Sequence, residues 1–152
     1  MEPNILDGEH VFVSYNEKLD VGKVVILEVT EYDNVNITES SFYIKRIIGK
    51  PGDQIRWNGN KLFVNDQEYK EEYFEDGHFG SSTVNQFDGI FTYKKNGETF
   101  TTETIPEGYY FVMGDNRGDS KDSRDIGLIP EKNIIGVAKY HMSFIIPRGK
   151  IR

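Results

Sequence analysis

The sequence predicts an all-β protein, with a barrel or sandwich core and a smaller inserted β cap. Three observations predict this class. Short runs rich in β-branched and aromatic residues recur along the chain and are separated by turn signals. Pro-Gly and Asn-Gly pairs stand where hairpins would turn. No segment of ten or more residues carries apolar residues at a helical period.

Five strands are expected in the first half of the chain. The first alternates between apolar and polar side chains, as a half-buried strand does. The next two carry many β-branched residues, which favour extended backbone. Asn58-Gly59 is a strong hairpin signal between the last two. In order, these strands are residues 10–15, 23–29, 41–48, 54–57 and 61–64.

Four more strands are expected in the second half. Asn96-Gly97 predicts a hairpin between two of them, and Pro106-Glu107-Gly108 predicts the turn before the third. A short helical turn that begins at Pro130 precedes the last strand. These strands are residues 89–93, 99–102, 109–113 and 134–140.

Composition divides the chain into two parts. Residues 66–105 are rich in Tyr, Phe, Gly, Glu and Thr, and they contain fewer aliphatic residues than their flanks. This change predicts an inserted cap subdomain on a β core formed by residues 1–65 and 106–152. A continuous β meander is the alternative.

Charge and cysteine content exclude several classes of function. The net charge of −7 and the pI near 5.0 argue against a nucleic-acid partner, which requires a basic face. Cysteine is absent, which excludes thiol nucleophiles, zinc–thiolate sites and disulfides. His10, His78 and His141 are far apart and show no metal-ligand spacing, so a metal site is not expected.

The two ends of the chain carry weaker signals. No apolar run approaches the roughly 20 residues needed to cross a bilayer. The chain starts abruptly at Met1-Glu2-Pro3, which predicts a soluble fragment of a longer protein. Phe144-Ile145-Ile146 is a candidate for contact with lipid, although core packing is the favoured interpretation of this triplet.

Residues 114–124 are the most informative stretch. They place three aspartates, two arginines, one lysine and two serines between two apolar segments. An ordinary solvated loop has this polarity too. Oppositely charged groups recur here at spacings that allow local pairing, however, and such pairing would fix the loop in one shape.

Lys45 lies within the apolar run Phe42-Tyr43-Ile44-Lys45-Arg46-Ile47-Ile48. Strict alternation puts Lys45 on one face of the strand and Arg46 on the other, so one of the two cations points toward apolar surroundings. The purely structural interpretation is that the lysine is solvated and the arginine is paired with an acidic side chain. The functional interpretation is a desolvated lysine, whose lowered pKa makes the amine a general base for a hydroxyl.

Three segments of the sequence resemble the motifs of the bacterial type I signal peptidases, in a Gram-positive-like form. The run from Tyr43 to Asp53 is similar to the family's lysine box. Residues 114–124 are similar to its later Gly-Asp-Asn-Arg…Ser…Asp-Ser-Arg box, and Met1-Glu2-Pro3-Asn4 to the end of its nucleophile box, Ser-Met-x-Pro-Thr. The three occur in the family's order, and the resemblance covers almost the whole chain outside the middle insertion.

The resemblance implies the signal-peptidase-type β fold and a membrane-anchored serine endopeptidase that removes signal peptides from exported proteins with a Ser-Lys dyad. It implies that Lys45 is the general base and that Ser120 orients its amine. Asp122 and Arg124 would form a supporting ion pair. Further scaffold residues of the site would be Asp115, Arg117 and Arg46.

The resemblance also implies the partners and the location. Tyr43, Ile44, Met1 and Pro3 would contact the substrate, which pairs with the strand through its backbone and has small residues before the cut. The partners would be the signal peptides of exported preproteins, with pilin subunits as one such class, and the membrane lipid surface. The globular part would lie on the extracytoplasmic side of the cytoplasmic membrane. The resemblance implies no metal and no cofactor.

The sequence departs from the family pattern at two positions. The family's nucleophilic serine directly precedes the methionine that matches Met1, so the nucleophile is expected just outside this chain and the chain as given is expected to be inactive. Asn4 stands where the family has threonine.

Other functions stay open. One is a non-catalytic relative that assists the assembly of pilin or surface proteins, although the retained Lys45 argues against it. A self-cleaving Ser-Lys repressor domain lacks a DNA-binding segment here, and it leaves residues 114–124 unexplained. A plain β-sandwich adhesion module is the structural alternative.

Overall fold

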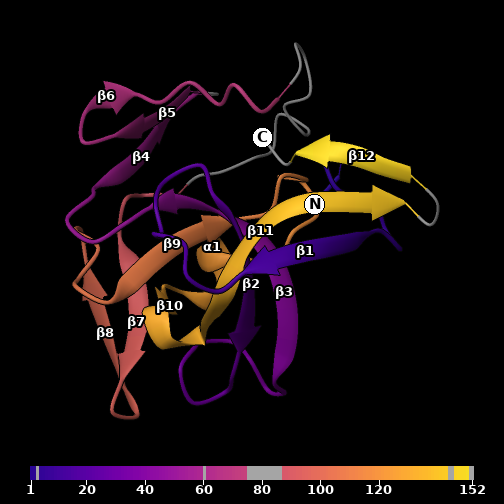
Figure 1. The fold of residues 1–152 in the computed structure, drawn as a ribbon. Coiled ribbons are helices and arrows are strands. Elements are labelled where there is room, and N and C mark those ends of the chain that lie inside the picture. Colours follow the sequence, from indigo (N-terminus) through magenta and orange to yellow (C-terminus); the bar gives the residue numbers. More distant parts are fainter. Residues whose placement is uncertain (3, 60, 75–86, 144–145, 151–152) are drawn as a thin grey trace.

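The computed structural model describes residues 1–2, 4–59, 61–74, 87–143 and 146–150, and it confirms the all-β class (Figure 1). The elements of the first half are β1 (His10–Ser14), β2 (Val24–Val29), β3 (Ser41–Gly49), β4 (Ile55–Asn58), β5 (Lys61–Val64) and β6 (Gln67–Glu68). Those of the second half are β7 (Phe91–Lys95), β8 (Glu98–Thr102), β9 (Tyr109–Met113), α1 (Ser123–Ile126), β10 (Ile129–Pro130), the 3-10 helix η1 (Glu131–Asn133), β11 (Ile134–Ser143) and β12 (Ile146–Lys150).

All nine expected strands form, with ends that differ by a few residues. The hairpin expected at Asn96-Gly97 joins β7 to β8, and both turn residues have positive φ angles of 52° and 82°, as a two-residue turn of this kind requires. The helical turn expected at Pro130 is η1, which Pro130 precedes. The elements α1, β6, β10 and β12 were not expected. β6 and β10 have two residues each and α1 has four, which is too few to show a period, and β12 contains a proline and a glycine, which are unfavourable in strands.

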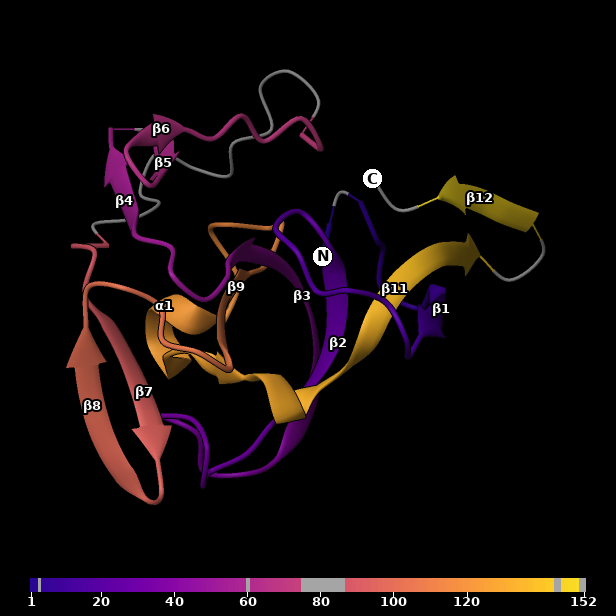
Figure 2. The ribbon, with the colours of Figure 1, turned by 60° about the vertical axis from the view of Figure 1, so that its left-hand side comes forward.

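The largest sheet has seven strands in the order β1-β11-β2-β3-β9-β10, with β12 paired to the far part of β11. All its pairs are antiparallel. Figure 2 shows β9, β3, β2 and β11 side by side in a strongly curved sheet. Right-handed strand twist and the register shifts within β11 and β3 produce this curvature.

Two smaller sheets lie beside β9, on the opposite side of the molecule from β12 (Figures 1 and 2). One contains β4, β5 and β6, and the other is the β7–β8 hairpin. The first of them includes residues on both sides of position 65. The division into a core and a cap at residues 66–105 stays a prediction.

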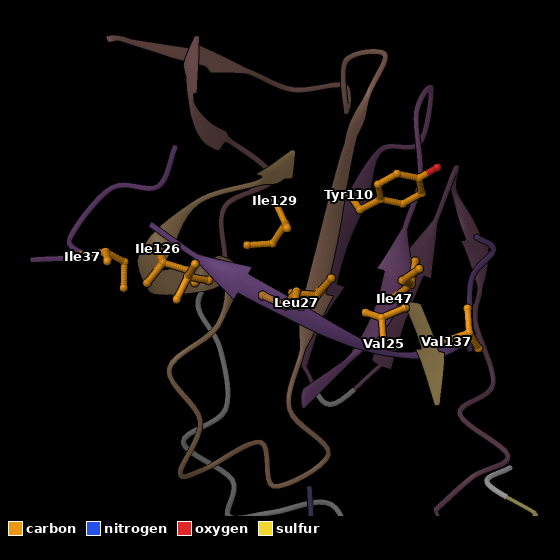
Figure 3. Close-up of a cluster of buried hydrophobic side chains, with 10 residues drawn as sticks. Val25, Leu27, Ile37, Ile47, Tyr110, Ile126, Ile129 and Val137 are labelled. Atoms are coloured by element: carbon orange, nitrogen blue, oxygen red, sulfur yellow. The ribbon is translucent and has the colours of Figure 1, made fainter. Parts of the chain in front are cut away.

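Two hydrophobic clusters fill the space on either side of β3 and β9. In β9, Tyr110 and Val112 belong to one cluster, whereas Phe111 and Met113 belong to the other. Both faces of this strand are therefore buried, which is why its sequence is continuously apolar instead of alternating. Figure 3 shows the first cluster, in which side chains of β2, β3, β9 and β11 meet those of α1 and β10.

In the part of the chain that the structure describes, no helix has both the length and the apolar character to span a membrane. The described residues also contain no group of three or more acidic, histidine or cysteine side chains arranged to hold a metal ion. His78, Phe144 and Ile145, which the sequence analysis considered, lie outside the described residues.

Candidate active site

The site begins at Lys45 in the middle of β3. The strand places its amine beside the loop that follows β9, and the Nζ donates a hydrogen bond to the Oγ of Ser120 at 3.0 Å. Lys45 lies on the same side of β3 as Tyr43, and its Nζ is 5.3 Å from the centre of that ring. Two residues that are 75 positions apart in sequence thus meet because β3 and β9 are neighbours in the sheet (Figure 2).

Burial lowers the pKa of Lys45 from its ordinary value of 10.5, because a half-buried ammonium ion loses part of its hydration. The carboxylates of Asp122, Asp115 and Asp119 oppose this shift, and the guanidinium of Arg124 adds to it. The desolvation is the largest effect. More of the amine is therefore neutral near physiological pH than in an exposed lysine, as a general base requires.

Gly114 is required next to Ser120. A Cβ atom on Gly114 would lie 2.7 Å from the Cβ of Ser120 and even closer to its Oγ, and it would lie 3.5 Å from the amine of Lys45. No larger residue fits without moving the serine. The glycine that follows β9 thereby allows the loop to bring its hydroxyl against Lys45.

Asp122 holds the loop in this shape. Its fully buried carboxylate accepts hydrogen bonds from the backbone N–H of Gly114 at 3.0 Å and from the side chain of Arg124 at 2.7 Å through each oxygen. The same carboxylate caps the start of α1. Arg124 also donates to the carbonyl of Arg117 at 3.0 Å, which closes the loop on itself.

Arg46 and Asp115 form a second ion pair on the other face of β3. Both side chains are fully buried, and two hydrogen bonds of 2.8 and 2.6 Å join them side by side. The amide of Asn4 donates to the same carboxylate at 2.7 Å. Asn4, the departure from the family pattern, thus has a specific partner that the sequence did not reveal.

Arg117 pairs with a residue that the sequence analysis missed. Its guanidinium makes two hydrogen bonds to the carboxylate of Glu71, one of them 3.0 Å long. Tyr73 lies beside this pair and is buried. Glu71 and Tyr73 both lie in the segment that follows β6. The charges of residues 114–124 indicated that these groups need partners, but they did not indicate which residues the partners are.

A groove of about 540 Å³ passes beside this site. It is lined by residues among the first eleven of the chain, by Ile26 of β2, by the start of β3, and by Asn116 and Asp119 of the loop. Lys45 and Ser120 do not line it, but their chain neighbours Ile44 and Asp119 do. Met1, Tyr43 and Ile44, three of the expected substrate-binding residues, line it. Pro3, the fourth, lies outside the described residues.

The edge of β3 is open along this groove. β9 pairs with β3 only from Arg46 onward, so in the described part of the chain residues 41–45 have a neighbouring strand on the β2 side alone. Unpaired backbone groups at a sheet edge can bind an extended peptide as an additional strand.

Met1 lies close to the amine of Lys45. The thioether of Met1 is 3.5 Å from the backbone nitrogen of Asp115, at the loop that carries Ser120. Burial lowers the pKa of the Met1 amine, and repulsion by the charge of Lys45 lowers it further. The Met1 amine is therefore near enough to Lys45 for the two charges to affect each other.

Comparison with known proteins identifies relatives over most of the chain. Residues 1–143 match the family described as "Signal peptidase, peptidase S26". Signal peptidase I of Streptococcus pneumoniae serotype 4 is 33% identical over 93% of this chain and 77% of its own length. Signal peptidase I of Bacillus licheniformis is 35% identical over 92% of this chain and 70% of its own. A crystal structure of signal peptidase I from Enterococcus faecalis V583 superposes with a TM-score of 0.57 and 26% identity, covering 80% of this chain and 97% of that one.

Proposed function

Because this chain belongs to the signal peptidase family, peptidase S26, we propose that its site removes signal peptides from exported proteins. One observation carries the proposal most directly. The amine of Lys45, whose pKa burial lowers, is held by Ser120, and their chain neighbours Ile44 and Asp119 line a groove beside the open edge of β3. This is the arrangement that a lysine general base needs beside an extended peptide.

The nucleophile in this proposal is the hydroxyl of a serine bonded to the nitrogen of Met1. Neutral Lys45 accepts the hydroxyl proton while the serine oxygen attacks the scissile carbonyl. The resulting ammonium then protonates the amine of the leaving polypeptide, and an acyl-enzyme remains. The same amine then deprotonates a water that attacks the ester carbonyl. As the ester bond breaks, the ammonium returns the proton to the serine oxygen and the signal peptide leaves with a new carboxylate. Ser120 orients the lysine through both steps, which is supported by its 3.0 Å hydrogen bond.

The substrate in this proposal is an extended segment that pairs with residues 41–45 of β3 and lies in the groove. Tyr43, Ile44 and Met1, which line the groove, contact its side chains, and as in the family resemblance the residues before the cut are small. The location we propose is the extracytoplasmic face of the cytoplasmic membrane, where signal peptides emerge. The role in pilin or surface-protein assembly stays a prediction, as does contact with lipid.

The proposal is tested with the chain extended by one serine before Met1. We expect the extended chain to cleave a peptide with an Ala-x-Ala signal sequence, and an otherwise identical chain with alanine at that position to be inactive. In the serine form, Lys45→Met should lower kcat by at least about 10³-fold, because it removes the amine that Ser120 orients to accept the proton. Product formation is followed by mass spectrometry.

Lys50→Met is the matched control. Lys50 lies just after β3 and its amine pairs with Asp20 at a solvent-exposed site, so its loss should leave cleavage unchanged. A folded serine form without activity would contradict the proposal. So would substantial turnover by the Lys45→Met variant.

A further inference from the structure

A short segment of the middle region lies directly against the loop that carries Ser120. We call residues 69–74 the strap. Its first residue, Tyr69, donates its backbone N–H to the carbonyl of Leu62 at 2.8 Å, which attaches the strap to β5. Its last four residues include Glu71 and Tyr73, both of which contact buried arginines of the site.

Glu71 and Arg117 form an ion pair that is almost completely buried. Their side chains are 4% and 3% exposed. Burial alone would lower the pKa of Arg117, but the hydrogen bonds and the charge of Glu71 outweigh this effect and raise it. A buried arginine without such a partner would be strongly unfavourable, so the position of Arg117 depends on the strap.

Tyr73 covers the second buried cation. Its ring centre is 3.7 Å from the guanidinium carbon of Arg46, which pairs with Asp115. Its hydroxyl donates to Glu71 at 2.5 Å and accepts from Arg117 at 3.2 Å. Burial raises the pKa of this phenol well above 10.0, so it stays protonated and keeps the donor that this bond requires. One tyrosine thus joins both ion pairs.

The contacts continue from Arg117 to the reacting amine. The Nε of Arg117 donates to the carbonyl of Gly114 at 3.1 Å, and the N–H of the same glycine donates to Asp122 at 3.0 Å. The peptide groups of Gly114 are therefore held from both sides. Ser120 packs on the bare Cα of this glycine and accepts the hydrogen bond from Lys45. A movement of Arg117 would shift the surface against which Ser120 is placed.

From this continuous set of contacts, we infer that Glu71 and Tyr73 are positioning residues for the proposed cleavage reaction. They act on Lys45 through Arg117, Gly114 and Ser120. The inference rests on the proposed function, because it concerns the same site. It assigns a role to a segment outside the motifs that identify the family, and it makes the geometry of the dyad depend on the middle region.

Kinetics of the serine-extended chain provide the first test. Glu71→Gln keeps the shape of the side chain but removes its charge, and we expect kcat to fall about tenfold with little change in KM. Tyr73→Phe keeps the ring over Arg46 and removes the hydroxyl, so a smaller loss is expected. Glu72→Gln is the matched control: Glu72 is the exposed neighbour of Glu71, and the same charge is removed without loss.

The pH at which Lys45 titrates separates positioning from a direct charge effect. Removal of a nearby negative charge alone would lower the pKa of Lys45. Loosening of the loop would admit water to the amine and raise this pKa toward 10.5. The charged or titratable groups that act on the amine are Asp122, Arg124, Asp115, Asp119 and the Met1 amine, and Glu71→Gln leaves all of them in place.

The pKa is measured by NMR of ¹³C-labelled lysine side chains in the chain as given, with Lys45 assigned from a Lys45→Arg spectrum. We expect Glu71→Gln to raise it and Glu72→Gln to leave it unchanged. A pKa that is unchanged or lowered in a folded Glu71→Gln variant, or a kcat equal to that of Glu72→Gln, would overturn the inference. If the serine-extended chain never cleaves, the proposed function fails while this measurement still decides the role of the strap.

A double-variant cycle excludes a general loss of stability. In an Arg117→Gln variant the ion pair between residues 71 and 117 is already lost. Adding Glu71→Gln to this variant should therefore cause no further change in the pKa of Lys45. An equal effect in both backgrounds would show that Glu71 does not act through Arg117, and it would overturn the route proposed here.

Discussion

Gly114 is the residue of the site with the least freedom to change. The space that a side chain would occupy is already filled by Ser120, whose Cβ lies 2.7 Å from the position that a methyl group on the glycine would take. The sequence places Gly114 in a polar loop, but the contact with Ser120 depends on how the residues between them fold back, which no local pattern predicts.

Gly114→Ala should therefore displace the hydroxyl of Ser120 from Lys45. In the serine-extended chain we expect a loss of about 10²-fold in kcat, the size of effect that a displacement of about 1 Å produces. The measurement is steady-state cleavage, with the melting temperature recorded in parallel. Addition of Ser120→Ala to this variant should cause little further loss, since the hydroxyl is already misplaced. Wild-type activity of Gly114→Ala would contradict the geometry.

The titration of Lys45 gives the second prediction at this scale. The protonated amine cannot accept a proton, and burial has lowered its pKa below 10.5. The kcat/KM of the serine-extended chain should thus rise with pH through this lowered pKa and level off above it. A profile of kcat/KM between about pH 6 and pH 10 measures this rise. A flat profile would mean that Lys45 is not the base.

Individual residues also show where prediction from sequence reached its limit. Lys45 and Ser120 were expected to be in contact because each lies in a segment that resembles an active-site motif of the same family. The Nζ of Lys45 and the Oγ of Ser120 are 3.0 Å apart. Their catalytic roles remain predictions until activity is measured. Glu71 could not be found in this way. It is 46 positions from Arg117, and its segment carries no motif.

At the scale of elements, the loop between β9 and α1 depends on Asp122. Its carboxylate binds the end of β9 through Gly114, binds Arg124, and caps the first turn of α1. The charge pattern of residues 114–124 predicted local pairing, and Asp122 and Arg124 do pair. The short α1 was not predicted, because a four-residue helix has no room for a repeating apolar pattern.

Asp122→Ala should lower the free energy of unfolding by about 3 kcal/mol, because it leaves Arg124 without its buried partner and removes a helix cap. Asp125→Ala is the matched control, since Asp125 lies exposed on the same helix and its loss should change stability by less than about 0.5 kcal/mol. Urea denaturation of both variants measures the difference. Equal midpoints would show that the loop is an ordinary solvated turn.

At the scale of the whole molecule, β3 and β9 form a wall shared by two hydrophobic clusters. Ile47 faces one cluster and Ile48 faces the other, and both side chains are fully buried. The all-β class could be predicted because each strand leaves a local pattern of apolar and β-branched residues in the sequence. Sheet order and the shared wall depend on contacts between distant segments, which no local pattern contains.

A shared wall predicts one cooperative unfolding transition. Ile47→Ala opens a cavity in the first cluster and should lower the free energy of unfolding by about 3 kcal/mol. Trp57, the one tryptophan, packs against the second cluster, so its fluorescence reports on the other side of the wall. Its transition should shift by as much as the circular dichroism transition. Separate midpoints would mean that the smaller sheets unfold independently.

The open edge of β3 has a consequence beyond peptide binding. A row of unpaired backbone groups is as available to the same strand of a second copy as to any other extended chain, and it is flanked by the exposed ring of Phe42. The exposed carboxylates of Glu2, Asp7 and Asp119 around the groove make two such edges repel each other at neutral pH. Repulsion between these carboxylates at the rim of the groove thus opposes edge-to-edge pairing of two copies of the chain.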